Sequence, residues 1–195
     1  MDNELIIFKT FRTSIILLTL LVTSYCVSAQ SSVSQSKLSS NGYWIHDKVE
    51  EIPGLKTGPF VRLGNGDILT VEVNKSCISK DEGKTWTEYP IFVDSSRFDI
   101  RIERALIRTK NGVIILAFAN DKEKANWNWQ NDIADAPGAT IPTYAVRSLD
   151  EGKTWQEPIK LHDEWTGATR DIKETKDGNV VISTMMMRHN PGHHA

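Results

Sequence analysis

The sequence predicts an all-β chain built from repeated units of four antiparallel strands. Three observations support this fold class. An eight-residue motif occurs twice, as SKDEGKTW at 79–86 and SLDEGKTW at 148–155, with seven of the eight positions identical. Short strand-like stretches flank both copies, and turn residues such as Asn-Gly and Asp-Gly separate them. No long stretch shows the apolar periodicity of a helix.

The octet has the composition of a turn that caps itself between two strands. Its Ser and Asp side chains can accept backbone N–H bonds within the turn. Its glycine can adopt a positive φ at little cost, and its tryptophan, which begins the outgoing strand, can bury a large apolar surface. The residues expected to have this structural role are Ser79, Asp81, Gly83 and Trp86 in the first copy, and Ser148, Asp150, Gly152 and Trp155 in the second.

Three units with the same order of elements follow one another along the chain. Each runs strand, hairpin, strand, strand, octet, strand, which is the order in one four-stranded blade of a β-propeller. The predicted strands are 58–63, 67–73, 76–79 and one from 85 in the first unit, 102–109, 113–120, 143–148 and one from 154 in the second, and 168–175 and 179–187 in the third.

The number of units bears on whether the fold is complete. The sequence holds about two and a half blades. A propeller closes with roughly four to eight, and a blade cannot bury both of its faces without neighbours. We therefore interpret the chain as a piece of a longer protein. The alternative is a complete small β protein whose last strands are degenerate.

The pattern S-x-D-x-G-x-T-W of both octets resembles the Asp-box, or BNR repeat, of sialidases and related β-propellers; we call the two copies the first box and the second box. The resemblance implies a propeller that has six blades when complete, with boxes at the blade periphery. It also implies an exo-glycosidase that hydrolyses a terminal acidic sugar, such as sialic acid, from glycans. Because Asp-boxes also occur in other propellers, a non-catalytic carbohydrate-binding or interaction propeller is the alternative, and a lyase on the same scaffold is a further one.

Arginines on the first predicted strands are candidates for binding the carboxylate of such a sugar. Arg104 and Arg170 lie eight positions before the turn glycine of their unit, whereas Arg62 and Arg108 lie four positions before theirs. A planar guanidinium binds a carboxylate through two hydrogen bonds and stays charged. The resemblance, in which three arginines hold the sugar carboxylate, points to Arg104 and Arg170, with Arg62 as the third. The alternative is that these arginines form ordinary ion pairs within the strands.

A long irregular stretch at 120–142 interrupts the second unit and is another candidate site. Trp127 and Trp129 place apolar rings in a polar loop, where they could stack on sugar faces or pin the loop onto its own blade. Asp132 and Asp135 are candidates for a general acid. Sialidases use a Tyr nucleophile with an assisting Glu, and the resemblance places these two residues in later blades.

Three histidines gather in RHNPGHH at 188–194. We expect His189 to contact substrate from a loop over the channel; metal binding or acid–base chemistry is the alternative for this cluster. Because no cysteine or carboxylate accompanies the histidines, the sequence predicts neither a metal site nor a cofactor.

The first 29 residues have the features of a secretory signal peptide. Lys9 and Arg12 precede an apolar run at 15–22, and small residues up to Ala29 provide a cleavage site. The run is too short for a comfortable membrane span. We therefore predict a secreted or periplasmic protein without a membrane span in the mature chain.

The composition of the mature chain argues against some classes of binding partner. A Ser-rich linker is predicted at 30–42 and the partial propeller domain at 43–195. The net charge is −2 and no basic run occurs, which argues against nucleic acid and anionic membranes. Cys77 is the only cysteine after the signal peptide, so no internal disulfide is expected. A glycan or glycoconjugate is the partner that the resemblance implies.

Overall fold

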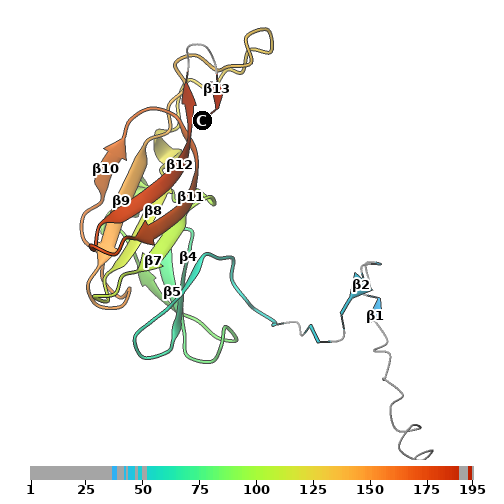
Figure 1. Cartoon of the computed structure of the whole chain (residues 1–195), viewed down its shortest axis with the longest axis vertical. Helices are drawn as coiled ribbons and strands as arrows, with labels where there is room; N and C mark the ends of the chain where they lie inside the picture. Colours follow the sequence, from blue (N-terminus) through green and yellow to red (C-terminus); the bar gives the residue numbers. More distant parts are fainter. Residues whose placement is uncertain are drawn as a thin grey trace, which may run out of the picture. The chain divides into compact units, whose positions relative to one another are not determined.

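The computed structural model describes residues 52–188 continuously, together with short stretches at 37–38, 42, 44–46, 48–49 and 193–194. The chain divides into two compact units, residues 1–51 and 52–195. In the first unit, β1 (Lys37–Leu38) pairs antiparallel with β2 (Trp44–Ile45). The predicted signal peptide and His189 lie outside the described residues. All further elements belong to the second unit (Figure 1).

Two four-stranded antiparallel sheets form most of the second unit. We call them blade 1 and blade 2. Blade 1 contains β3 (Phe60–Arg62), β4 (Ile68–Glu72), β5 (Lys75–Ser79) and β6 (Thr87–Pro90), in that order. Blade 2 contains β7 (Ala105–Arg108), β8 (Ile114–Ala119), β9 (Thr143–Ser148) and β10 (Ile159–His162), again in chain order.

A third sheet follows, made of β11 (Thr166–Glu174), β12 (Val180–Arg188) and the short β13 (His193–His194). The described part has two helical turns of the 3₁₀ type, η1 (Ser95–Arg97) and η2 (Asp121–Glu123). No helix in this part is long and apolar enough to cross a membrane.

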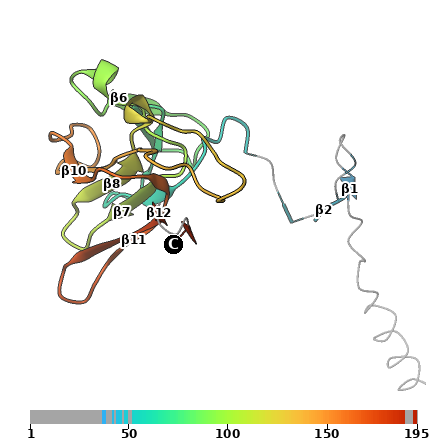
Figure 2. The same cartoon turned by 90° about the horizontal axis from the view of Figure 1, so that it is seen from above.

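The first strands of the three sheets are neighbours in space. β11 packs against β7 and β8 (Figure 2). β3 lies next to β7. Successive four-stranded antiparallel sheets that pack through adjacent first strands form a propeller-like arrangement. The predicted all-β fold with four-stranded antiparallel sheets is therefore confirmed, and six blades for a closed ring stays a prediction.

The strands follow the sequence prediction closely, with one clear difference. The fourth strand of the second unit begins at Ile159 rather than at 154. Pro158 has no N–H to donate to a ladder. The Trp155 indole N–H donates to the Gly152 carbonyl at 3.1 Å and lies 3.4 Å from Ser76 Oγ of blade 1. The end of the second box therefore contributes to the contact between blades before the strand begins.

Blade 2 buries its two faces against different neighbours, since side chains alternate between the faces along a strand. Leu69 of β4 packs with Leu116 and Phe118 of β8 in one cluster between blades 1 and 2. On the opposite face of blade 2, Ala117 packs with Ile172 of β11 in a second cluster. Blade 2 is thus the middle layer, with one apolar face for each neighbouring sheet.

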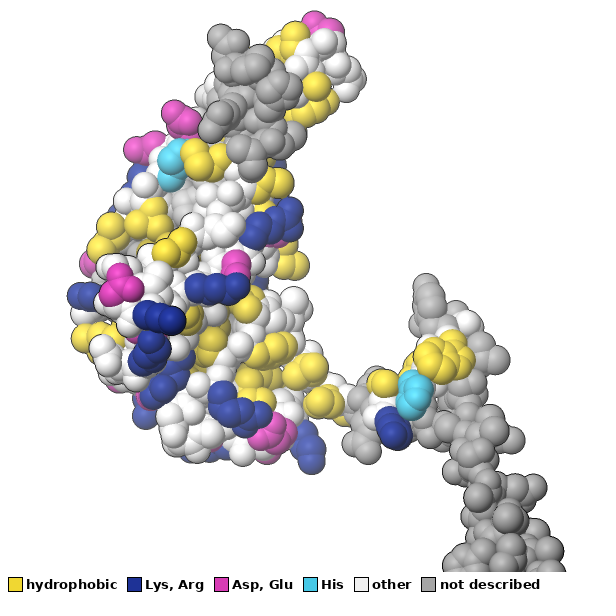
Figure 3. All heavy atoms as spheres, in the orientation of Figure 1, with side chains coloured by type: hydrophobic (Ala, Val, Ile, Leu, Met, Phe, Trp, Pro, Cys, Tyr) yellow, Lys and Arg dark blue, Asp and Glu magenta, His cyan; other side chains and the backbone are white. Residues whose placement is uncertain are grey.

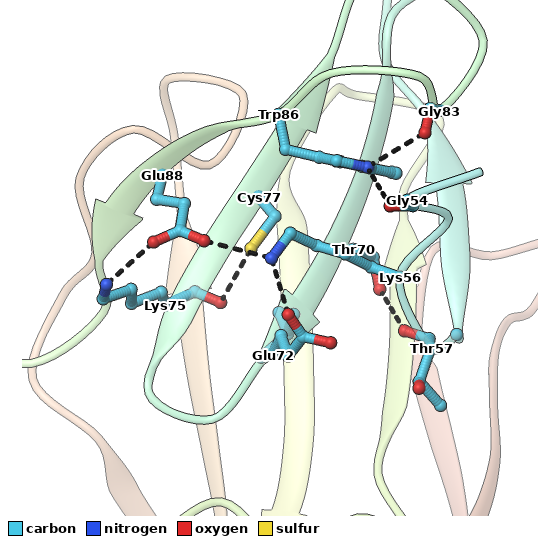
Figure 4. Close-up of polar contacts among 12 residues, drawn as sticks. Gly54, Lys56, Thr57, Thr70, Glu72, Lys75, Cys77, Gly83, Trp86 and Glu88 are labelled. Carbon is cyan, nitrogen blue, oxygen red and sulfur yellow. Dashed lines mark hydrogen bonds and ion pairs between the residues drawn. The ribbon is translucent and has the colours of Figure 1, made fainter.

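The segment 52–57 runs across blade 1 as a strap (Figure 4). Trp86 Nε1 donates to the carbonyl oxygens of Gly54, at 3.1 Å, and Gly83, at 3.0 Å. Lys56 Nζ lies 2.6 Å from a Glu72 oxygen and 3.0 Å from a Glu88 oxygen. The strap therefore fixes the first box and joins β4 to β6 through one lysine.

Candidate functional site

The two ends of blade 2 carry different features. Ile114 of β8 pairs with Ser148 at the end that leads to the second box, whereas Ala119 pairs with Thr143 at the end from which the insertion 120–142 projects (Figure 1). We call the end of blade 2 near Ser148 the corner end and the end near Thr143 the insertion end. The second box lies at the corner end, so we expect a binding surface at the insertion end.

The first box forms a closed network of hydrogen bonds. Ser79 Oγ donates to Asp81 Oδ1 at 2.8 Å and accepts from the Gly83 N–H at 2.8 Å. Asp81 also accepts from the Thr85 N–H at 2.8 Å and from the Thr85 hydroxyl at 2.6 Å. Every oxygen of the Asp81 carboxylate is thus used inside the turn.

The second box repeats this network. Ser148 Oγ donates to Asp150 Oδ1 at 2.8 Å, and the Thr154 N–H and hydroxyl donate to the same carboxylate at 2.9 and 2.7 Å. Burial raises the pKa of Asp150, but the bonds from Thr154 and Ser148 outweigh it, so the pKa is lowered overall. Both box aspartates are carboxylates that hold a turn together.

We expect acid to remove the stabilisation that Asp81 gives to the first box. The pKa of Asp81 is lowered from 3.8 to about 2 because the Thr85 hydroxyl and N–H, then Ser79, bond to its carboxylate. A lowered folded-state pKa stabilises the fold above the unfolded-state value and loses this effect as pH falls through the folded value. The stability difference between wild type and Asp81→Ala should therefore shrink from about pH 4 down to about pH 2. Urea unfolding across this range measures it, and a difference independent of pH would contradict the assignment.

A glutamate inside each box binds an arginine of the first strand in the same blade. Arg62 donates to the two carboxylate oxygens of Glu82 at 3.0 and 3.2 Å and to the Gly66 carbonyl at 2.8 Å. In blade 2, Arg108 donates to Glu151 Oε1 at 2.8 Å. Arg62 and Arg108, which share a position in the repeat, therefore both form an ion pair with the glutamate of their box. For Arg62 this is the alternative of ion pairing rather than the expected binding of a sugar carboxylate.

Arg104 and Arg170 share the other position of the repeat but differ in their surroundings. Arg104 is 7% exposed, and its guanidinium donates to the backbone carbonyl of Val71 in blade 1. Burial lowers the pKa of Arg104. Arg170 is exposed on β11, with its Nη2 3.7 Å from Met185 Sδ. Arg62, Arg104 and Arg170 thus have different surroundings: an ion pair with Glu82, a buried contact with the Val71 carbonyl and an exposed position on β11.

The insertion carries an aromatic stack at its base. The Trp127 ring lies 4.3 Å from the Trp165 ring and 5.9 Å from the Trp129 ring, with both pairs stacked. Trp165 is 5% exposed and belongs to a cluster with Ala119 and Ile141, whereas Trp127 and Trp129 are 44% and 38% exposed. We call Trp127, Trp129 and Trp165 the aromatic platform. Figure 3 shows hydrophobic atoms exposed at the upper end of the molecule, where the insertion lies in Figure 1.

A lysine provides positive charge beside the platform. Lys124 Nζ lies 5.6 Å from the centre of the Trp127 ring and 5.7 Å from that of the Trp165 ring. At this distance an ammonium is attracted by the face of an indole. Sequence reasoning missed both Lys124 and Trp165, because neither belongs to a motif and Trp165 lies outside the insertion.

A partly exposed carboxylate, that of Glu123, anchors the insertion to the sheet. Glu123 accepts hydrogen bonds from Tyr144 Oη at 2.6 Å, Asn120 Nδ2 at 2.7 Å and Lys160 Nζ at 3.2 Å. Burial raises the pKa of Glu123, but these three donors outweigh it, so the pKa is lowered. Burial and the neighbouring Glu123 raise the pKa of Tyr144. The Tyr144 phenol therefore stays protonated and donates to Glu123.

The two aspartates predicted as acids have different positions in the insertion. Asp135 is 1% exposed, and its Oδ1 accepts from the Ala136 N–H at 2.7 Å. Asp132 is exposed, one residue after Asn131, whose Oδ1 accepts from Trp129 Nε1 at 3.1 Å. Asp132 is therefore open to a ligand at the edge of the platform, whereas Asp135 contributes to the fold of the loop.

Arg101, which belongs to no motif of the sequence, ties the start of the insertion to the third sheet. It donates to Asp121 Oδ1 at 2.8 Å and to the Gly167 carbonyl at 3.0 Å, and it pairs with Glu103 at 3.0 Å. Within the described residues, no group of His, Cys, Asp and Glu is arranged to hold a metal ion.

Comparison with known proteins gives distant structural similarities. No family model matches the chain, and no curated protein matches it. The chain is similar to a crystal structure of a protein of unknown function from Dyadobacter fermentans DSM 18053, with 23% identity and a TM-score of 0.47 over 69% of this chain and 48% of that one. It is also similar to the Hadza microbial sialidase Hz136, with 20% identity and a TM-score of 0.46 over 73% of this chain and 34% of that one. The chain thus covers 48% and 34% of these two proteins.

Proposed function

We propose that this chain is part of a secreted, sialidase-like propeller that binds glycans ending in an acidic sugar at the aromatic platform. The observation that carries the proposal is the stack of Trp127 and Trp129 on the buried Trp165. A flat, exposed indole face fits the apolar face of a sugar ring, and a buried ring beneath it keeps the face in place. Such a surface needs no rearrangement on binding, which lowers the entropy cost.

The charge beside the platform supports an acidic ligand. The Lys124 ammonium lies next to the rings of Trp127 and Trp165, where it can pair with a carboxylate carried by a stacked sugar. Arg170 is exposed on β11 and is a second candidate for the carboxylate. Arg62 and Arg104 are already engaged with Glu82 and with backbone carbonyls, so we assign them to the fold.

Hydrolysis of the terminal acidic sugar is the finer proposal, with Asp132 as the general acid. The carboxylate of Asp132 is exposed in the turn that holds Trp129, so it is accessible to a glycosidic oxygen of a bound glycan. A non-catalytic carbohydrate-binding propeller is the second candidate. The contacts of Arg62 with Glu82 and of Arg104 with the Val71 carbonyl favour it, because they occupy two of the guanidinium groups that a sugar carboxylate would need.

A titration of the chain with oligosaccharides tests the binding proposal. We expect saturable binding of sialylated or uronic-acid oligosaccharides, followed by tryptophan fluorescence and calorimetry. Trp127→Ala should weaken binding about tenfold or more, equal to a loss of about 1.4 kcal/mol. Trp44→Ala removes a tryptophan that is 64% exposed in the first unit, and it should leave binding unchanged. Lys124→Gln should weaken the acidic ligands only.

Turnover of fluorogenic α-sialosides and uronides by the full-length protein separates the catalytic proposal from the binding proposal. Release of the fluorophore that Asp132→Asn abolishes supports hydrolysis. Binding without release supports the non-catalytic alternative, and a product with ultraviolet absorption of an unsaturated sugar indicates a lyase. If no glycan in the panel binds, or if Trp127→Ala leaves binding unchanged, the platform is not a glycan site.

A further inference from the structure

The outward face of blade 1 carries a row of three side chains from neighbouring strands. Leu69 of β4 belongs to the cluster between blades 1 and 2, so the next residue, Thr70, points to the opposite face. Residues paired in register share a face, and Thr70 pairs with Cys77 of β5, which pairs with Glu88 of β6. Thr70, Cys77 and Glu88 therefore form a row that faces away from blade 2, with Cys77 in the middle.

The strap 52–57 is bonded to both ends of this row. Thr70 Oγ1 donates to the Thr57 carbonyl at 2.9 Å, and Lys56 Nζ lies 3.0 Å from Glu88 Oε1 (Figure 4). Cys77, between these two contacts, is 0% exposed although its row lies on the face away from blade 2. The strap therefore covers Cys77.

Polar contacts hold the strap, and the apolar packing beneath it is incomplete. Ile52 and Leu55 of the strap are 42% and 49% exposed, and Phe60 of β3 is 42% exposed. A hollow of about 410 Å³ remains beside the strap, lined by these three residues and by Val61 and Ile68 of blade 1. Few buried apolar contacts mark a segment that opens locally at a lower free energy than the fold as a whole.

The Lys56 ammonium closes the strap between two carboxylates. Its Nζ lies 2.6 Å from Glu72 Oε2 as well as 3.0 Å from Glu88 Oε1, and both glutamate side chains are 38% exposed. Salt screens charges that are open to solvent, so the hold of the ammonium should weaken as the ionic strength rises. Burial raises the pKa of the Cys77 thiol, and the thiolate is the form that reacts. Cys77 is therefore inert while the strap covers it.

We propose that the strap is a salt-sensitive cover, which lifts off the outward face of blade 1 when the Lys56 ion pairs break while the four strands stay paired. The strands β3 to β6 are hydrogen-bonded to one another and do not need the strap for their ladder. Trp86 Nε1 loses the Gly54 carbonyl but keeps that of Gly83, so the first box stays closed. Lifting opens Cys77 to solvent, and access to this face of blade 1 thus depends on ionic strength.

The rate at which Cys77 reacts with dithiodipyridine, an uncharged aromatic disulfide, tests this proposal under native conditions. Cys26→Ser removes the other cysteine of the chain. The Cys77 thiolate then attacks the disulfide, forms a mixed disulfide and releases one coloured pyridinethiolate. In this background Lys56→Gln should raise the rate about tenfold, the effect of losing a hydrogen bond to a charged group. Lys75→Gln is the matched control, because Lys75 binds the same Glu88 at 2.7 Å but is not part of the strap; the rate should stay close to that of the unchanged lysines.

Salt and urea provide the second measurement. The rate should rise with sodium chloride when Lys56 is present and much less in Lys56→Gln. Lifting exposes little surface, so the rate should change little with urea below the unfolding transition, whereas reaction through unfolding of the whole blade rises steeply with urea.

Three results would overturn the proposal. A rate as steep in urea as global unfolding would show that the strap opens only together with blade 1. Equal acceleration by Lys56→Gln and Lys75→Gln would assign the effect to the charge around Glu88 and not to the strap. A rate that is independent of salt while Lys56 is present would show that its ion pairs do not hold the cover.

Discussion

Replacing Gly152 with alanine is expected to lower the free energy of unfolding by about 3 kcal/mol, combining the left-handed backbone cost and an overpacked contact. Gly152 has φ +84°, and an added Cβ would be 2.1 Å from Leu69 Cδ1. Leu69 is fully buried, so it cannot move aside without disturbing the cluster between blades 1 and 2. Urea unfolding of the variant and the wild type measures the loss.

Gly66→Ala is the matched control for this prediction. Gly66 has φ +92°, and a Cβ there would meet no atom within 4 Å. Only the backbone cost applies, so the expected loss is about 1 to 2 kcal/mol. If the two variants lose equal stability, the packing of the second box on blade 1 contributes nothing to the free energy of unfolding.

The local structure of the boxes could be predicted from sequence, whereas their packing could not. The side chains of Ser79 and Asp81 bond to residues at most four positions away, so the octet alone specifies the turn. The contact between Gly152 and Leu69 joins residues of different sheets, and no local pattern encodes how sheets are placed. The same limit applies to the strands. Local sequence predicts their order within a blade, but it does not predict which sheet packs on each face of the blade.

Arginines at equivalent positions of the repeat have the same partners in one case and different surroundings in the other. Arg62 and Arg108 have the same position and the same kind of partner, Glu82 and Glu151, each at the fourth place of a box. That pairing was readable from the repeat, because all four residues recur in register. Arg104 and Arg170 also correspond, but the preceding sheet buries Arg104 against Val71 and leaves Arg170 exposed.

Two of the three residues of the aromatic platform could be predicted from the sequence. Trp127 and Trp129 stand out as apolar rings in a polar loop, and both prove to be exposed. The residue beneath them, Trp165, lies between β10 and β11 and carries no motif. Its contact with Trp127 crosses a separation in sequence that spans two strands, β9 and β10, so only the fold could bring the two rings together.

Replacing Trp165 with alanine is expected to cost about 3 to 5 kcal/mol of stability, the usual range for a buried tryptophan. The change removes the ring under Trp127 and leaves a cavity beside Ile141, whose backbone carbonyl accepts from the Thr166 N–H at 3.1 Å. Loss of the ring should also release the insertion. Urea unfolding gives the stability, and hydrogen exchange of residues 124–140 reports the release.

Trp129→Ala separates the support of the platform from its exposed surface. Trp129 is 38% exposed and its ring lies 5.9 Å from that of Trp127, whereas Trp165 is 5% exposed and lies 4.3 Å from it. Removal of Trp129 should therefore cost far less stability and leave exchange in the insertion unchanged. Both variants should weaken glycan binding, Trp129→Ala by loss of contact area and Trp165→Ala by loss of order. A Trp165→Ala variant that keeps the wild-type exchange rates in the insertion would show that Glu123, through Tyr144 and Lys160, is sufficient to hold Trp127 in place. The position of Trp127 would then depend on the hydrogen bonds of Glu123 and would not require the Trp165 ring.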